Sequence, residues 1–140
     1  WDDPLPEIEQ RETLKLHGET VLLVEDEPLV RAMVARILAD EGLNVLEAAN
    51  GEEALRIVEK QNEGNIDLLL TDVVMPYMGG IQLVESLRET RPDIRVLLAS
   101  GLTQKEVSDR CGPDFGAEFL AKPFSVSDLA AKIRLLVESL

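Results

Sequence analysis

The chain has 140 residues, 45% hydrophobic and 29% charged, which is the balance of a single globular domain. Its formal net charge of −13 argues against direct binding to nucleic acid, and no apolar run is long enough to cross a membrane. One cysteine, one histidine and the lack of a signal-peptide pattern exclude a disulfide framework and most zinc sites, and they favour a cytoplasmic location.

Residues 1–18 differ in composition from the rest of the chain. Prolines at positions 4 and 6 and dense charge interrupt them, and only residues 6–16 carry a weak helical pattern. We predict that residues 1–18 are a linker or tail and that residues 19–140 form the domain. A linker at the start suggests a piece of a longer protein.

The first half of the domain alternates short apolar runs with helical patterns. Residues 20–24 are the first predicted strand, and the apolar stripe of a helix follows until Gly42. Residues 45–48 are a short second strand. Asn50 is expected to cap a second helix, with Glu53 completing a capping box.

The next elements continue this alternation. After a turn at 62–65, an apolar third strand is expected at 66–71, with Asp72 at its carboxyl end. A helix is expected at 80–90 and a fourth strand at 95–100.

The last third of the chain adds a polar helix at 103–110, a strand at 118–121 and a final helix capped by Ser125. Five apolar strands that alternate with five helices predict an α/β fold. The sheet should be parallel and covered on both faces, with right-handed crossovers.

Polar groups follow four of the predicted strands. Glu25 and Asp26 end the first strand and Asp72 the third, while Ser100 ends the fourth and Lys122 the fifth. Because parallel strands point the same way, these groups should share the sheet edge where ligands of open α/β sheets bind. Three carboxylates in one place repel one another unless a cation neutralises them, and oxygen ligands favour Mg²⁺.

Carboxylates, Mg²⁺, a lysine and a hydroxyl are together the parts used for phosphoryl transfer. A carboxylate is able to act as the nucleophile itself, which would leave an aspartyl-phosphate on Asp72. The structural alternative is that Asp72 merely caps the turn after its strand, as Asp often does.

Four motifs occur in order, each at a strand end. They are Val-Glu-Asp-Glu at 24–27, Asp-Val-Val-Met-Pro at 72–76 followed by Gly80, Ser-Gly at 100–101 and Lys-Pro-Phe at 122–124. Together they resemble the receiver domain of two-component signalling over about residues 20–140. The resemblance implies a flavodoxin-like, doubly wound five-stranded sheet of order 2-1-3-4-5 with five helices.

The resemblance also implies roles at the sheet edge. Asp72 matches the phosphoacceptor, Asp26 a direct Mg²⁺ ligand, and Glu25 its acidic neighbour that acts through water. The backbone carbonyl of Val74 is a further expected metal ligand.

On the other side of the phosphoacceptor, Lys122 matches the lysine that pairs with the phosphoryl group, and the Lys122–Pro123 peptide bond is expected to be cis. Ser100 matches the hydroxyl that moves to the phosphoryl oxygen after transfer, and Phe119 the aromatic residue that rotates inward with it. The expected function is a phosphoacceptor switch more than a turnover enzyme.

The partner implied by the resemblance is a histidine kinase or a histidine phosphotransfer domain, docking near Leu29, Val30 and Met33. A second copy of the chain is a further candidate partner, whereas contact with nucleic acid or a membrane is not expected. The domain is either the C-terminal receiver of a hybrid histidine kinase or a stand-alone regulator.

Two other functions stay open. An aspartyl-nucleophile phosphatase would carry a second Asp two residues after the nucleophile, where this chain has Val74. A pseudo-receiver scaffold would never be phosphorylated, although Asp26, Asp72 and Lys122 are intact. Val74 and Leu102, two residues after the phosphoacceptor and the hydroxyl, are apolar and should hinder the water that hydrolyses an aspartyl-phosphate.

Overall fold

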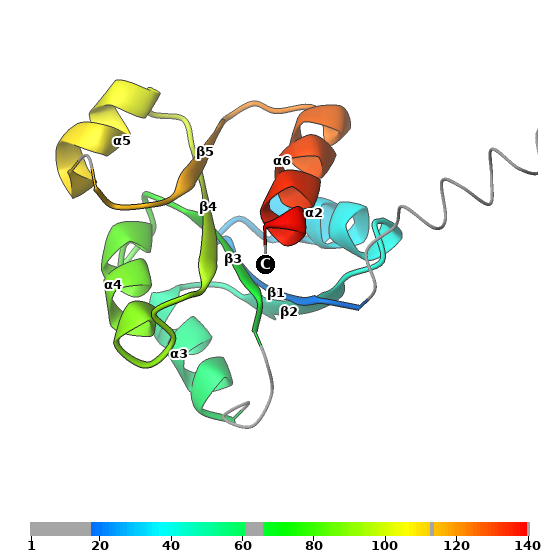
Figure 1. Ribbon diagram of the computed structural model, residues 1–140, viewed down its shortest axis with the longest axis horizontal. Coiled ribbons are helices and arrows are strands. Elements are labelled where there is room, and N and C mark those ends of the chain that lie inside the picture. Colours follow the sequence, from blue (N-terminus) through cyan, green and yellow to red (C-terminus); the bar gives the residue numbers. More distant parts are fainter. Residues whose placement is uncertain (1–17, 61–65, 113, 140) are drawn as a thin grey trace, which may run out of the picture.

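The computed structural model describes residues 18–60, 66–112 and 114–139, in which five strands alternate with five helices (Figure 1). The strands are β1 (Thr20–Val24), β2 (Asn44–Ala48), β3 (Leu68–Asp72), β4 (Arg95–Ser100) and β5 (Glu118–Ala121). The helices are α2 (Pro28–Asp40), α3 (Gly51–Lys60), α4 (Gly80–Thr90), α5 (Gln104–Cys111) and α6 (Val126–Glu138). The predicted turn at 62–65 and the weak helical pattern at 6–16 lie outside the described residues, and the boundary at residue 18 stays a prediction.

All five strands form one parallel sheet in the order β2-β1-β3-β4-β5. This confirms the expected α/β, doubly wound arrangement. The register sets the strand ends at a common edge, because Val24 pairs with Thr71, Asp72 with Ala99, and Ser100 with Ala121.

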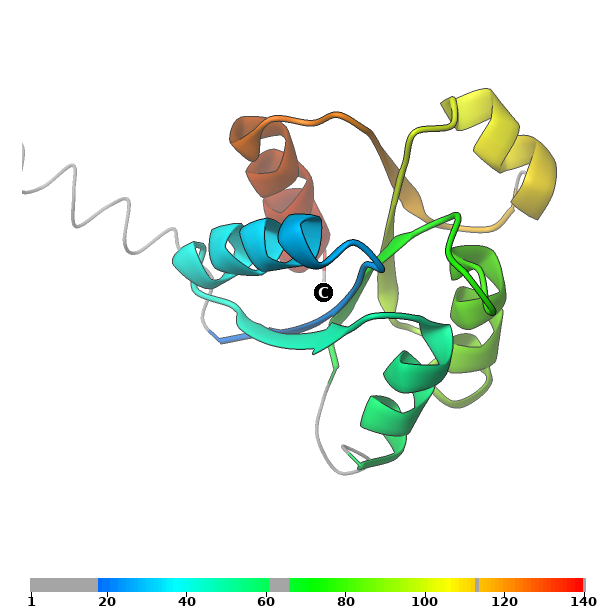
Figure 2. The same cartoon turned by 180° about the vertical axis from the view of Figure 1, so that it is seen from behind.

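The helices cover the two faces of the sheet in separate layers. Helices α2 and α6 lie on one face and α3, α4 and α5 on the other (Figures 1 and 2). Successive strand residues point to opposite faces, so Val21 and Leu23 pack with α2 and α6 while Leu22 and Val24 pack with α3 and α4. Both faces of the sheet are therefore apolar, as the near-continuous hydrophobic runs of the strands require.

Two of the strands, β3 and β2, have bounds that differ from the sequence prediction. β3 begins at Leu68 and not at 66, because its ladder with β1 starts with the pair Val21 and Leu68. Asp67 precedes the strand and uses its carboxylate to accept the N–H of Thr20 at 2.9 Å. β2 begins one residue early, at Asn44, opposite Thr20.

Side-chain caps begin three of the helices. Asn50 accepts the N–H of Glu53 at 2.8 Å, as predicted, although the Glu53 carboxylate reaches back to the N–H of Ala49. Ser125 caps α6, and Thr103 caps α5, which therefore starts one residue later than expected. Within the described ranges, no helix combines the length and apolarity needed to cross a bilayer.

Candidate functional site

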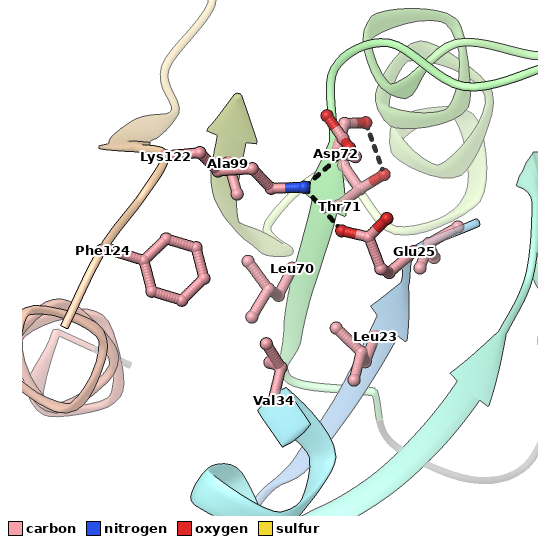
Figure 3. Close-up of a pocket in the computed structure, with 10 residues that line it drawn as sticks. Leu23, Glu25, Val34, Leu70, Thr71, Asp72, Ala99, Lys122 and Phe124 are labelled. Carbon is pink, nitrogen blue, oxygen red and sulfur yellow. Dashed lines mark hydrogen bonds and ion pairs between the residues drawn. The ribbon is translucent and has the colours of Figure 1, made fainter. Parts of the chain in front are cut away.

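The carboxyl edge of the sheet brings together side chains from the segment after β1, the end of β3 and the segment after β5. The Nζ atom of Lys122 lies 2.6 Å from Glu25 Oε1 and 2.9 Å from Asp72 Oδ2, and it points between the two carboxylates (Figure 3). The Lys122–Pro123 peptide bond is cis, as expected. Apolar side chains line the space on the other side of these polar groups, among them Leu23, Val34, Leu70 and Phe124.

Asp26 joins this group and completes an acidic cluster. Glu25, Asp26 and Asp72 each offer a carboxylate oxygen, and these atoms all lie within 4.8 Å of one another. Three carboxylates beside one ammonium leave an excess of negative charge. Oxygen ligands with such an excess suit a hard divalent cation, so the donor set fits Mg²⁺.

The charges of this cluster are coupled through Lys122. Burial would raise the pKa of Glu25, but hydrogen bonds from Lys122 and from the N–H of Glu27 lower this pKa below its usual value. Burial would likewise lower the pKa of Lys122, but its two carboxylate partners raise it. Partial loss of hydration and the adjacent Glu25 carboxylate raise the pKa of Asp26, which is otherwise exposed. Glu25 and Lys122 therefore form a charged pair at neutral pH.

The turn after β3 fixes the position of Asp72. The N–H of Gly80 donates to the carbonyl of Val73 at 2.9 Å, and a Cβ atom at position 80 would lie only 2.1 Å from the backbone oxygen of Asp72. Glycine is therefore required for α4 to start so close to the strand. In the turn between β3 and α4, Val74 exposes 54% of its surface and donates its N–H to Asp72 Oδ1 at 3.3 Å.

The two expected switch residues lie on neighbouring strands. Ser100 is buried, and its Oγ accepts the N–H of Leu102 at 3.0 Å. Phe119 is half-buried on β5 and lines a cavity of about 180 Å³ together with Leu98 and Val107. The structure thus gives Ser100 a place at the carboxyl edge and Phe119 a place in the wall of a cavity next to α5.

Sequence reasoning missed two contacts at this edge. It did not foresee that both Glu25 carboxylate oxygens accept hydrogen bonds, one from Lys122 and one from the N–H of Glu27; the role of Glu25 at the metal stays a prediction. It also passed over Arg31, whose guanidinium donates to the backbone carbonyl of Glu25 at 2.7 Å. The available signal was an arginine in the first turns of the helix directly after the acidic motif.

The sequence profile of the response regulator receiver domain family matches residues 21–134. The chain belongs to this family. Its acidic pocket of Glu25, Asp26 and Asp72 is typical of the phosphoacceptor site of a receiver.

Individual relatives agree with this assignment. The receiver is 43% identical, over 85% of its length, to the sensor kinase CckA of Brucella abortus, of which it covers 12%. It also spans only half or less of the transcriptional regulators that it resembles.

Two solved structures share the fold. The receiver domain of the hybrid histidine kinase CckA is 38% identical, with a TM-score of 0.71, and the match covers 84% of this receiver and 98% of that chain. The response regulator TrrA of Thermotoga maritima, solved in complex with Mg²⁺ and BeF, is 29% identical, with a TM-score of 0.70 and coverages of 84% and 98%.

Proposed function

We propose that this receiver takes a phosphoryl group from a phosphohistidine onto Asp72, with Mg²⁺ bound at the acidic cluster, and so acts as a switch in a phosphorelay. The observation that carries this proposal is the ammonium of Lys122, held 2.9 Å from Asp72 Oδ2 beside two further carboxylates. The cluster supplies oxygen ligands for a hard cation, and the ammonium supplies a donor for phosphoryl oxygens. TrrA, a relative with the same fold, was solved with Mg²⁺ and a BeF group, which supports the choice of metal.

The proposed reaction uses a carboxylate oxygen of Asp72 as the nucleophile. This oxygen forms a bond to phosphorus while the phosphorus–nitrogen bond of the donor breaks, and the imidazole nitrogen keeps the bonding electron pair. Bound Mg²⁺ would neutralise charge on the phosphoryl oxygens. Asp26 and the carbonyl of Val74 would hold the metal directly and Glu25 through water, while Lys122 donates to the transferred group.

The switch would begin at the hydroxyl of Ser100. Its oxygen accepts the N–H of Leu102, and a phosphoryl oxygen on Asp72 would give its O–H a charged acceptor and so draw the side chain towards the site. Movement of Ser100 would vacate space beside β5, and Phe119, which lines a cavity of about 180 Å³ next to α5, would turn inward with it. Phosphorylation would then shift a population between two surface states.

The proposed donor is a histidine kinase or a histidine phosphotransfer domain. An apolar groove lined by Val30, Met33 and Phe124 lies beside Lys122, and Leu29 next to it exposes 80% of its surface. An amphipathic helix that presents the phosphohistidine would cover this groove and bring its phosphorus to Asp72. The similarity to a sensor kinase supports a place within a hybrid histidine kinase in the cytoplasm, with a stand-alone regulator as the alternative.

The decisive measurement is intact mass after incubation with Mg²⁺ and acetyl phosphate. We expect the wild type to gain one phosphoryl group, and expect no gain in Asp72→Asn or without Mg²⁺. Asp93→Asn, which changes an exposed aspartate, is the matched control and should be phosphorylated like the wild type.

Each other outcome selects a different function. No gain in a wild type that still binds Mg²⁺ would favour the unphosphorylated scaffold. Continuous release of phosphate from small phosphoesters at a constant rate would favour the phosphatase, and a gain that persists in Asp72→Asn would assign the phosphoryl group to another residue.

A further inference from the structure

We infer that Arg31 is a positioning residue for the metal site, because it fixes the backbone of the segment that carries Glu25 and Asp26. This inference rests on the proposed function, since it concerns how the same acidic cluster is held for Mg²⁺. Arg31 does not itself belong to the cluster. It acts on the cluster through the peptide carbonyl of Glu25, to which its Nη1 atom donates at 2.7 Å.

Few backbone hydrogen bonds hold the segment between β1 and α2. The N–H of Glu25 extends the sheet by donating to the carbonyl of Ala48 at 3.1 Å. After that residue the chain leaves the ladder, and α2 begins at Pro28 with Glu27 as an N-cap that makes no side-chain capping bond. The two carboxylates that face the metal site thus lie on a short connection without regular structure.

Arg31 ties this connection to two rigid elements at once. It belongs to α2, where its own N–H donates to the carbonyl of Glu27 at 2.9 Å. Its Nε atom lies 3.6 Å from Glu47 Oε1 on β2, while Nη1 holds the carbonyl of Glu25. The Arg31 side chain is only 22% exposed, so this geometry is enclosed by its neighbours. Helix α2, strand β2 and the end of strand β1 are therefore joined by one planar guanidinium.

A metal site depends on the placement of its ligands to within about 0.5 Å. A charge-assisted hydrogen bond to the carbonyl of Glu25 limits rotation of the peptide unit between Glu25 and Asp26, and thereby the direction of both side chains. Loss of such an outer partner weakens metal sites by roughly 10–100-fold. We expect the lower end of this range here, because Lys122 and the N–H of Glu27 still hold the Glu25 carboxylate.

The sign of the effect separates positioning from simple electrostatics. Arg31 is a cation near an acidic site, so by charge alone its removal should strengthen binding of Mg²⁺. If Arg31 positions the ligands, its removal should weaken binding instead. Arg36→Ala, at an exposed position further along the same helix, removes the same charge without touching the Glu25 carbonyl and reports the sign of the electrostatic contribution, at a longer distance.

The experiment is a Mg²⁺ titration of the wild type, Arg31→Ala, Arg31→Lys and Arg36→Ala, followed by the backbone amide resonances of the folded protein. We expect the dissociation constant of Arg31→Ala to rise about tenfold, that of Arg31→Lys to rise less because one donor and the charge remain, and that of Arg36→Ala to fall slightly or stay unchanged. Phosphorylation by acetyl phosphate should then need more Mg²⁺ in Arg31→Ala but reach nearly the wild-type rate at saturation.

Equal or tighter Mg²⁺ binding by folded Arg31→Ala would overturn the inference. So would unchanged Mg²⁺ binding combined with slower transfer from a phosphohistidine donor, since Arg31 would then act in docking. If Arg31→Ala does not fold, Arg31→Lys decides by the same comparison with Arg36→Ala. A wild type that binds no Mg²⁺ would instead refute the proposed function, so the two failures are distinguishable.

Discussion

Two cations hold distant segments of this receiver together, and their surroundings have opposite chemistry. At the carboxyl edge of the sheet, Lys122 lies between the carboxylates of Glu25 and Asp72. Near the far end of α4, Arg88 donates to the backbone carbonyls of Phe115 and Gly116, and its guanidinium lies 4.8 Å from the centroid of the Phe115 ring.

The partners of Arg88 and Lys122 indicate different roles for the two regions. Two neutral carbonyls accept hydrogen bonds from Arg88, and the ring lies against its guanidinium. This Arg88 contact holds the segment before β5 against α4. Lys122 balances only one of three negative charges at its edge, and the remaining charge still attracts a cation. The acidic edge thus differs from the Arg88 contact because it concentrates several carboxylates in one place, where a cation can bind them together.

Removal of Lys122 is expected to have the largest effect on the acidic edge. In Lys122→Ala we expect phosphorylation by acetyl phosphate to slow roughly a hundredfold, the cost of losing one charge-stabilising donor. Mg²⁺ should nevertheless bind more tightly, because the acidic cluster loses its only ammonium partner among the described residues. Rates from intact mass and a Mg²⁺ titration measure the two effects.

Lys132→Ala is the matched control for this variant. Lys132 pairs with Glu118 at 3.2 Å on the surface between α6 and β5, so its loss removes the same charge away from the edge. Weaker Mg²⁺ binding in Lys122→Ala would mean that the lysine organises the carboxylates more than it competes with the metal.

Gly80→Ala tests how closely α4 must approach Asp72. The clash of the added Cβ with the Asp72 carbonyl costs about 3 kcal/mol, since backbone atoms must shift, whereas better helix propensity returns less than about 1 kcal/mol at this first helical residue. We expect a net loss of stability in urea unfolding and slower phosphorylation. In Gly101→Ala the added Cβ meets nothing within 4 Å, and stability should stay within about 0.5 kcal/mol of the wild type. Equal stabilities of the two variants would contradict the tight turn.

The same contrast explains how much the sequence could predict. Asp72, Ser100 and Lys122 each stand at the end of an apolar run, and parallel strands bring such ends to one edge, so their shared edge followed from local pattern. Their individual roles came from the family resemblance and stay predictions. Arg88 reaches carbonyls 27 and 28 residues away, a contact between a side chain and backbone that leaves no local sequence signal. The start of β3 at Leu68 was missed for a related reason, because pairing with β1 sets it.

Arg88→Ala removes the contact between α4 and the segment before β5. Loss of two hydrogen bonds to carbonyls and of the ring contact should cost about 2 kcal/mol, since each hydrogen bond contributes about 1 kcal/mol and the rest is small at a partly exposed site. Amide hydrogen exchange should rise around Phe115 while the phosphorylation rate stays unchanged. Arg88→Lys keeps the charge but loses the planar guanidinium that donates to both carbonyls, so it should lose most of the same stability. A large fall in phosphorylation rate in folded Arg88→Ala would show that the Arg88 contact and the acidic edge are energetically coupled.

The smallest effect is expected at the mouth of the site, where Val74 exposes 54% of its surface beside Asp72. An apolar side chain there offers no hydrogen bond to a water that approaches the phosphorus of an aspartyl-phosphate. In Val74→Asn the amide would hold such a water, so dephosphorylation should become several-fold faster, while phosphorylation still requires Asp72. The decay of the phosphorylated mass after removal of acetyl phosphate measures this rate. Val126→Asn, which changes a valine of similar exposure at the start of α6, should decay like the wild type. Equal decay of Val74→Asn and Val126→Asn would mean that the side chain at position 74 does not control access of water to the phosphoryl group.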